Sequence, residues 1–301
     1  RTFNVANELT ARDTDSNSSP NYSPAYDAVG NMTDDGKQYT LVYDAFGRLR
    51  FIKDRSSGDV IEEFAYNGLN HRVGWHYDAD VDSDVDSNDP WFHFVYDRNW
   101  RMVATVRNGD PDAKELFVNH QAGSNGTGLA LPLDATVLRD REHSTSWANA
   151  PTGPTYQRAY YCQNFFGGRG DLVVVLSSAG VISQQVRYSA YGVPYGLPAG
   201  DTNADGSVVA TPDITAMNGW LGTSEVRGDL DLDGDCDNDD MNVLVSNFGK
   251  GLGWNKLSIG VDQTLSGVLG GHRKGYCGYE HDWVNHSVMH VRNRAYFAEL
   301  G

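Results

Sequence analysis

The chain has 301 residues, enough for roughly two domains at about 150 residues each. Its 33 glycines, 16 tyrosines, 40% hydrophobic and 21% charged residues indicate a turn-rich globular protein and exclude a disordered one. The net charge of −16 is local, because residues 201–250 hold 11 acidic and 2 basic side chains and residues 78–89 hold 6 acidic and no basic ones. Such acidity disfavours nucleic acid and anionic membranes as partners and favours cations. The longest strongly apolar stretch, Leu172 to Leu176, is far shorter than the roughly 18 residues that a membrane helix needs.

The first residue and the cysteines give weaker signals. The chain begins at Arg1 without a basic segment followed by an apolar run, so we expect a fragment or a processed piece from which any signal peptide has been removed. Cys162, Cys236 and Cys277 form no CxxC motif and cannot all pair within one chain. We expect buried free thiols, and a disulfide between Cys162 and Cys277 is the alternative.

A short turn motif recurs along the first two thirds of the chain. Residues 26–30 and 43–47 share the pattern Y-D-A-x-G, and degenerate copies follow at 66–70, 77–78, 96–97 and 188–192. Asp at the first position and Gly at the fourth are the preferences of a type I turn, where Gly accepts positive φ. Each tyrosine is therefore expected to end one strand, and the next strand begins after the glycine.

The segments between these turns favour β-structure. They include residues 38–43, 49–53, 60–66 and 102–107, and Gly-containing pairs at 57–58, 108–109 and 179–180 mark the opposite turns. Alternation is imperfect within residues 60–66, which leaves the register open. The sequence predicts an all-β protein built as a meander of short antiparallel strands.

The ordered series of motifs resembles the YD repeats of the RHS and teneurin superfamily. Residues 160–194 are similar to the segment before the RHS-associated core, and residues 275–301 are similar to the start of the core itself. The resemblance covers residues 26–198 and 272–301 and implies a wall segment of a large hollow β-shell. Because the chain stops at Gly301, before the Arg and Asp-Pro region that normally follows in this family, no autoproteolytic residues are nominated.

The acidic segment between these two parts has the spacing of calcium loops. Calcium takes six to eight oxygen ligands, and a twelve-residue EF-hand loop supplies them at fixed positions around a turn glycine. Gly234 is the turn glycine of one such loop, and an amphipathic helix with Met241, Leu244, Val245 and Phe248 on one face follows it. The expected ligands are Asp229, Asp231, Asp233, Asp235 and Asp240.

A second copy of the loop lies 28 residues earlier. Its expected ligands are Asp201, Asn203, Asp205, Ser207 and Asp213, and its helix carries Ile214, Met217 and Leu221 on one face. Pro212 occupies position 12 and the acid falls at position 13, which leaves bidentate ligation there open. The paired loop–helix units resemble a type I dockerin. The alternative is a pair of solvated acidic turns whose aspartates cap helices.

Other candidate sites give weaker signals. Residues 78–89 repeat the acidic spacing without the turn glycine, so an acidic hairpin loop is favoured over a third calcium site. His281, His286 and His290 are expected to be hydrated hairpin residues rather than zinc ligands. The sequence shows no nucleophile elbow, zinc-protease helix, P-loop or dinucleotide fingerprint, so we expect no catalytic activity.

These observations predict three parts: a β-shell segment at 1–199, a paired EF-hand calcium module at 200–250, and a return to the shell at 251–301. The resemblance implies a non-catalytic, extracellular or cell-surface bacterial protein that serves encapsulation, display or adhesion. Three alternatives stay open, and a carbohydrate hydrolase carried on a dockerin is the weakest of them. The shell could enclose the toxin of a polymorphic-toxin system, or the module could dock to a cohesin-like partner through Ala210, Thr211, Asn238 and Asp239.

Overall fold

The computed structural model describes residues 1–13, 19–78, 82, 84–120, 135–142, 149–150, 153–164, 170–178, 180, 182–185, 187–188, 192, 194–195, 200–202, 207–225, 228, 230, 235–249, 274–282, 288–291 and 294–297. The strands of the N-terminal half are β1 (Thr2–Phe3), β2 (Leu9–Ala11), β3 (Ala25–Tyr26), β4 (Met32–Asp34), β5 (Tyr39–Tyr43), β6 (Leu49–Asp54), β7 (Val60–Tyr66), β8 (Arg72–Tyr77), β9 (Trp91–Tyr96), β10 (Met102–Arg107), β11 (Ala113–Asn119) and β12 (Thr136–Glu142). Then follow β13 (Tyr156–Asn164), β14 (Asp171–Ser177), β15 (Ile182–Gln185), β16 (Arg187–Tyr188), β17 (Pro194–Tyr195), η2 (Ala210–Ile214), α1 (Thr215–Trp220), α2 (Asn238–Ser246), η3 (Tyr276–Gly278), β18 (Glu280–His281), β19 (Val288–Val291) and β20 (Arg294–Phe297).

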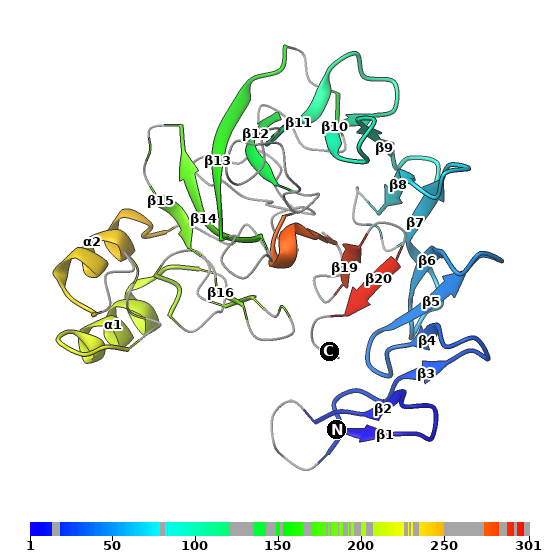
Figure 1. The fold of residues 1–301 in the computed structure, drawn as a ribbon, viewed down its shortest axis with the longest axis horizontal. Coiled ribbons are helices and arrows are strands. Elements are labelled where there is room, and N and C mark those ends of the chain that lie inside the picture. The colour runs from blue at the N-terminus through cyan, green and yellow to red at the C-terminus, as the bar shows by residue number, and fades with distance from the viewer. Residues whose placement is uncertain are drawn as a thin grey trace.

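One antiparallel sheet dominates the structure. Its 13 described strands, β3 to β15, are hydrogen-bonded in the order in which they occur in the chain. The sheet curves so that its concave face surrounds the C-terminal strands β19 and β20 (Figure 1). The expected all-β meander is therefore confirmed, and the bounds expected for the strands at 60–66 and 102–107 agree with β7 and β10.

The recurring turns have the conformation that the motif predicts. In the turn after β5, the Gly47 N–H donates to the Asp44 carbonyl over 3.0 Å, and Gly47 has φ of 71°. Asp44 Oδ1 also accepts hydrogen bonds from the backbone N–H groups of Phe46 (2.8 Å) and Arg48 (3.0 Å). One side chain thus fixes the whole turn locally, which is why the motif is readable from sequence. The same bonds are made by Asp27, Asn67 and Asp97.

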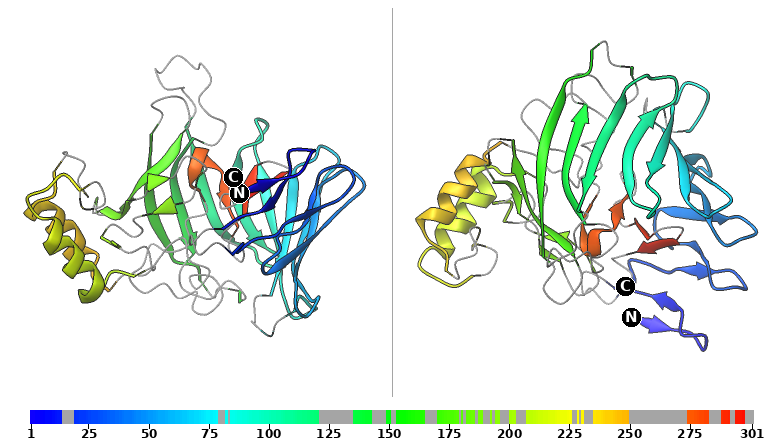
Figure 2. Two further views of the ribbon diagram at one scale, coloured as in Figure 1. Left: turned by 90° about the horizontal axis from the view of Figure 1, so that it is seen from below. Right: turned by 45° about the horizontal axis from the view of Figure 1, so that its top comes forward.

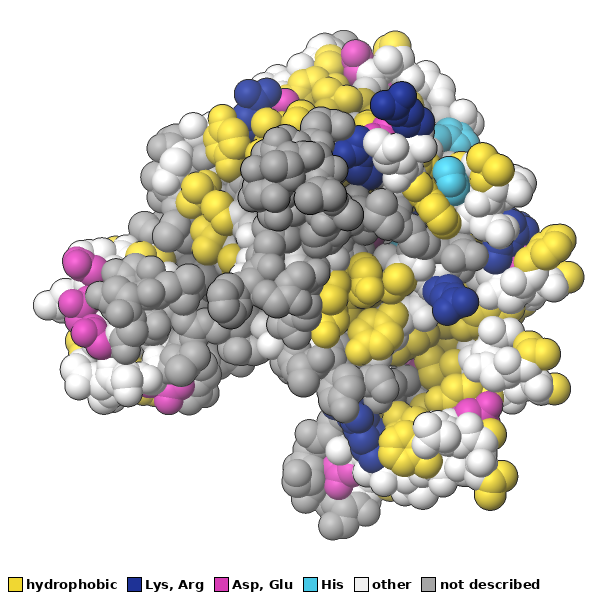
Figure 3. All heavy atoms as spheres, viewed as in Figure 1, with side chains coloured by type: hydrophobic (Ala, Val, Ile, Leu, Met, Phe, Trp, Pro, Cys, Tyr) yellow, Lys and Arg dark blue, Asp and Glu magenta, His cyan; other side chains and the backbone are white. Residues whose placement is uncertain are grey.

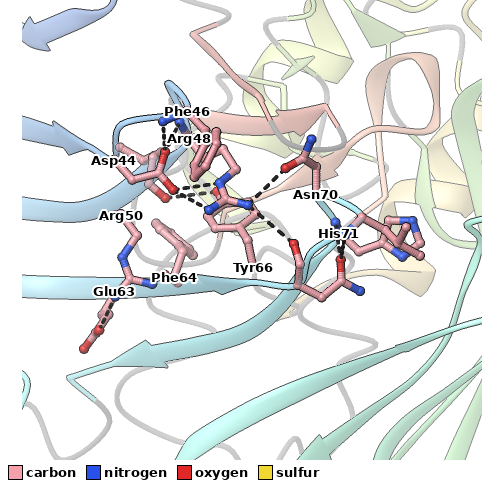
Figure 4. Close-up of polar contacts among 12 residues, drawn as sticks. Asp44, Phe46, Arg48, Arg50, Glu63, Phe64, Tyr66, Asn70 and His71 are labelled. Atoms are coloured by element: carbon pink, nitrogen blue, oxygen red, sulfur yellow. Dashed lines mark hydrogen bonds and ion pairs between the residues drawn. The ribbon is translucent and has the colours of Figure 1, made fainter.

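Arg48 joins one of these turns to the next along the sheet (Figure 4). Its guanidinium donates to Asn70 Oδ1 over 3.0 Å and to the Asn67 carbonyl over 3.4 Å. The guanidinium carbon also lies 5.0 Å from the ring centres of both Phe46 and Tyr66. Cation–π contacts of this kind stabilise successive turns against one another.

The main hydrophobic core lies on the concave face and includes the C-terminal hairpin. Ile52, Phe64 and Phe92 are fully buried, and Val288 of β19 belongs to the same cluster. Each such side chain contributes about 1.5–3 kcal/mol by leaving water. Figure 3 shows hydrophobic side chains gathered on the face that Figure 1 presents. The core thus holds β19 against a sheet to which it has no sequence proximity.

The cysteines and the helices were the subject of two smaller expectations. All three cysteines are free, as expected, but Cys162 is exposed and Cys277 is half-buried, so the expectation of burial is correct only for Cys236. In the described part of the chain no helix is long and apolar enough to cross a membrane.

Candidate metal centre

The two short helices belong to a compact unit of their own. α1 and α2 lie outside the sheet, beyond its β14–β15 end (Figures 1 and 2). Acidic side chains gather over this unit on the face that Figure 3 presents. The helical module, defined here as residues 200–249, contains all ten predicted metal ligands in its sequence.

Asp240 is the central acid of the second loop. It is fully buried in the first turn of α2. Its Oδ1 accepts the Leu230 N–H over 2.5 Å, and its Oδ2 accepts the Asp237 N–H over 2.7 Å. The Asp237 side chain accepts the Asp239 N–H over 2.7 Å and completes a capping box by also accepting the Asp240 N–H. These bonds fix the position of the Asp240 carboxylate, and a carboxylate oxygen can accept more than one interaction.

Three carboxylates converge at this point. One oxygen from each of Asp235, Asp237 and Asp240 lies within 4.8 Å of the others. Oxygen ligands of calcium lie about 2.3–2.6 Å from the ion, so oxygens separated in this way fit one coordination shell. Asp237 was not among the expected ligands. It occupies position 9 of the loop, a position that often ligates through water, and this signal would have identified it.

Asp213 is the central acid of the first loop. It is fully buried, and its Oδ1 accepts hydrogen bonds from the N–H (2.8 Å) and hydroxyl (2.9 Å) of Thr202. Its Oδ2 accepts the Val209 N–H over 2.8 Å. Thr202 and Val209 are positions 2 and 9 of their loop, as Leu230 and Asp237 are of theirs. The acids of the two loops therefore bind equivalent backbone groups.

The extra residue in the first loop is absorbed locally. A wide π-type turn, η2, spans Ala210–Ile214, and Thr211 within it is extended at φ −132° and ψ 120°. Such a turn accommodates one more residue than an α-helical turn. Asp213 at position 13 thereby takes the place that Asp240 takes at position 12.

Backbone bonds tie each helix to the opposite loop. The Gly222 N–H after α1 donates to the Cys236 carbonyl over 2.7 Å, and the Gly249 N–H after α2 donates to the Val208 carbonyl over 2.8 Å. Val208 and Cys236 are both position 8 of their loops, so the module is a structural duplication with exchanged contacts. Its core consists of Val208, Met217, Leu230, Cys236 and Leu244, with Ile214, Trp220, Leu221, Met241 and Val243 packed against it.

The expected apolar face of α2 is partly wrong. Leu244 is buried and Met241 packs on the core, but Val245 is 54% exposed and Phe248 is 51% exposed. The core of the module covers only the Leu244 and Met241 side of the helix, and Gly200 lies directly against Leu244: a Cβ at Gly200 would be 2.9 Å from the Leu244 Cα. The expected face of α1 agrees with the structure.

The remaining expected ligands are divided between described and undescribed parts of the chain. Asp201 is buried with 1% exposure, Ser207 is half-buried and Asp235 is exposed. The remaining five, Asn203, Asp205, Asp229, Asp231 and Asp233, lie outside the described residues. Five of the ten expected ligands, Asp201, Ser207, Asp213, Asp235 and Asp240, are thus among the described residues.

The third acidic stretch connects β8 to β9, as expected. Asp84 is exposed, and a hydrogen-bonding interaction with Asp82 raises its pKa. The Asp82 N–H is bonded to Asp78 Oδ1 over 3.1 Å. Within this stretch the described residues form no group of three carboxylates as close as that at Asp240. The acidic hairpin loop remains the better interpretation.

The other candidates for chemistry show different environments. His290 is 7% exposed and bonded to Asp282 Oδ2 over 2.8 Å, so the expectation of a hydrated residue was wrong for it. A groove of about 490 Å³ lies between Tyr26, Tyr43 and Phe297. Among the described residues its lining holds one charged side chain, Arg294, and no carboxylate, imidazole or thiol.

Comparisons with known proteins give only weak similarity. No protein-family model and no curated protein matches the sequence. The crystal structure of TcdB2-TccC3 is similar over 92% of this chain and 9% of that chain, with a TM-score of 0.46 and 14% identity. The crystal structure of TcdB2-TccC3-Cdc42 is similar over 61% of this chain and 8% of that chain, with a TM-score of 0.36 and 15% identity. This chain thus spans less than a tenth of the length of these solved chains, and values of this size assign neither a family nor an activity.

Proposed function

We propose that the chain is a non-catalytic wall segment of a secreted or cell-surface RHS/YD-repeat protein, and that its helical module binds calcium. The observation that carries the calcium part is the equivalence of Asp213 and Asp240. In the two copies of the loop, each accepts hydrogen bonds from the backbone N–H groups at loop positions 2 and 9. A pair of solvated acidic turns does not explain why the last carboxylate is buried in the same way in both loops. A duplicated calcium loop explains it, because the acid at position 12 closes the coordination shell.

Electrostatics supports the same proposal. Asp235, Asp237 and Asp240 bring three formal negative charges within 4.8 Å, and Asp240 is fully buried. Such a group repels itself without a cation. Because all of its proposed ligands offer oxygen atoms, the module favours a hard divalent ion over zinc or copper.

Calorimetry tests the calcium proposal directly. The intact chain is stripped with a chelator and titrated with calcium, and we expect saturable heat at two sites. A variant with Asp235→Asn and Asp237→Asn keeps the buried Asp240 and should lose the heat of one site. The control variant, Asp82→Asn with Asp84→Asn, removes as many acids from the third acidic stretch and should bind as the parent does. Equal loss in both variants, or no heat at millimolar calcium, would rule the module out as a calcium site.

A shell role rests on the shape of the sheet. Thirteen described strands follow one another in one curved layer, and four of the hairpin turns are held by a side chain of their own first residue. A layer of this kind extends by adding hairpins, so it suits encapsulation or display. The alternative of an enclosed toxin is tested by sequencing the gene beyond residue 301. An Asp-Pro core followed by an unrelated domain would support it.

Docking to a cohesin-like partner is a second candidate. It is favoured by the exposure of Val245 on α2 and of Phe248 in the turn that follows α2. The four expected docking residues, Ala210, Thr211, Asn238 and Asp239, are also exposed. A pull-down with immobilised cohesin domains should recover the chain only in calcium, and the Val245→Asp variant should lose this recovery. Absence of recovery in calcium would remove the candidate.

A further inference from the structure

A buried group of ionisable side chains lies between the concave face of the sheet and the C-terminal segment 274–297. Glu62 of β7 is 0% exposed and Arg72 of β8 is 3% exposed. Facing them, Glu280 is 6%, Asp282 is 3% and His290 is 7% exposed. Charged groups are rarely buried without partners, so the contacts within this group decide how the segment is held.

Arg72 and Glu280 satisfy one another. The Arg72 Nη2 donates to Glu280 Oε1 over 2.5 Å. The guanidinium also lies 4.6 Å from the ring centre of Phe94 and 5.6 Å from that of Phe64. The positive charge of Arg72 is therefore largely neutralised by the Glu280 carboxylate, and it compensates a second carboxylate only weakly.

The other two carboxyl groups of this buried group belong to Asp282 and Glu62. Asp282 Oδ2 is bonded to His290 Nε2 over 2.8 Å. Neither oxygen of Glu62 accepts a hydrogen bond from a donor in the described part of the chain. The residues opposite Glu62 on the neighbouring strands are Ile52 and Tyr77, both buried. An ionised Glu62 would thus be a second carboxylate in an apolar site, whereas a protonated one can donate to Asp282, with which it interacts.

We propose that a proton held between Glu62 and Asp282 fastens the C-terminal segment 274–297 to the sheet, and that loss of this proton releases the segment. The balance of charge is the reason. Three carboxyl groups share this region with two cationic groups, Arg72 and Lys274, and with an imidazole, so ionisation of all three would leave one uncompensated negative charge in a buried site.

The other ionisable groups around Glu62 do not supply that compensation. Tyr39 of β5 is neutral, because burial, followed by the charges of Glu62 and Asp282, raises its pKa far above the neutral range. Burial, followed by the charge of Arg72, lowers the pKa of His290, so its imidazole tends to be uncharged. Lys274 is buried and lines a small cavity together with Arg72, Glu280 and His290, but among the charged groups that act on Glu62 the strongest are Asp282 and Arg72.

The pH dependence follows from linkage. Burial raises the pKa of Glu62 well above its usual 4.5, and the charge of Asp282 raises it further. Between the usual pKa of Glu62 and its raised value in the docked state, a rise in pH removes the proton from Glu62 when the segment is released but not when it is docked. Docking therefore becomes weaker as the pH rises. The opening constant should rise about tenfold per pH unit until the docked Glu62 also ionises, and should then level off.

Hydrogen exchange of the β19 amides, corrected for the intrinsic pH dependence of exchange, measures this opening in the intact chain. We expect the rise with pH in the parent protein and a flat profile in the Glu62→Gln variant, because glutamine keeps the shape and a donor but does not titrate. Glu63→Gln is the matched control. Glu63 is next in the chain and pairs with Arg50 over 2.9 Å on the other face of β7, so its variant should behave as the parent does.

Two results would overturn the proposal. One is a rise of opening with pH that persists in Glu62→Gln. The other is an opening constant of β19 that does not change from about pH 5 to about pH 9, measured in the parent protein alone. The second result holds even if Glu62→Gln fails to fold.

Discussion

Replacing Asp240 by alanine separates the structural contribution of this carboxylate from its contribution to metal binding. Without calcium, the substitution leaves the N–H groups of Leu230 and Asp237 without their acceptor. Each lost bond costs about 1 kcal/mol, so α2 should be destabilised by about 2 kcal/mol. With calcium about 100-fold above its dissociation constant, the parent gains about 2.7 kcal/mol that the variant lacks. The total difference should then approach about 5 kcal/mol.

Hydrogen exchange of the α2 amides reports this local free energy in the intact chain. A loss of about 2 kcal/mol makes exchange about thirtyfold faster, and calcium should protect the parent but not the variant. Asp239→Ala is the matched control, because Asp239 is exposed in the same helical turn and its side chain contacts only Asn242, at 3.5 Å, among the contacts described. The reasoning fails if Asp240→Ala exchanges no faster than Asp239→Ala, or if calcium protects both variants equally.

Two further predictions concern the packing of the module and the turns of the sheet. Gly200→Ala should destabilise the module by more than about 1 kcal/mol, since Gly200 has φ of 98° and a Cβ would be 2.8 Å from the Leu244 Cγ; thermal unfolding followed at α2 checks it, and Gly222→Ala, with open space around it, should cost less. Partial burial raises the pKa of Asp44, but the hydrogen bonds from the Arg48 side chain and the backbone outweigh it, so the net shift is downward. Stability from this turn is therefore present above about pH 3.8 and lost as the pH falls through the lowered folded value, and an acid titration of unfolding should be shallower in Asp44→Asn than in the parent.

The hairpins were predictable because their determinants are local. The turn around Asp44 needs only its own carboxylate, the backbone of the next four residues and a glycine at positive φ. Every strand of the main sheet then pairs with its neighbour in the chain. A pattern that spans five residues therefore carries enough information to place both strands.

The helical module was predictable in outline but not in detail. The spacing of its acids identified both loops, yet it placed Asp213 one residue too late for a standard loop, because a sequence pattern does not reveal that a wide turn absorbs the extra residue. The 3.6-residue period also assigned Val245 and Phe248 to the buried face of α2. Periodicity shows which side chains share a face, but the elements packed against the helix decide how much of that face is covered. Here the core of the module covers Met241 and Leu244 and leaves Val245 and Phe248 exposed.

The polar attachment of the C-terminal segment could not be predicted, because its partners are remote in sequence. Arg72 and Glu280 are 208 residues apart, and nothing near either residue indicates the other. Glu62 lies in the stretch 60–66, whose imperfect alternation left the register open and gave no sign that this side chain is fully buried.

This separation between local and remote contacts decides what should happen when the segment is released. β7 and β8 are each paired on both sides within the sheet, to β6 and β9 as well as to one another. They keep those backbone bonds whether or not segment 274–297 is docked, whereas β19 pairs only with β18 and β20 among the described strands. Opening caused by ionisation of Glu62 should therefore expose the β19 amides while those of β7 and β8 stay protected. Equal exposure of all three would mean that the sheet itself unfolds, and that the buried acid sets global stability instead of fastening one segment.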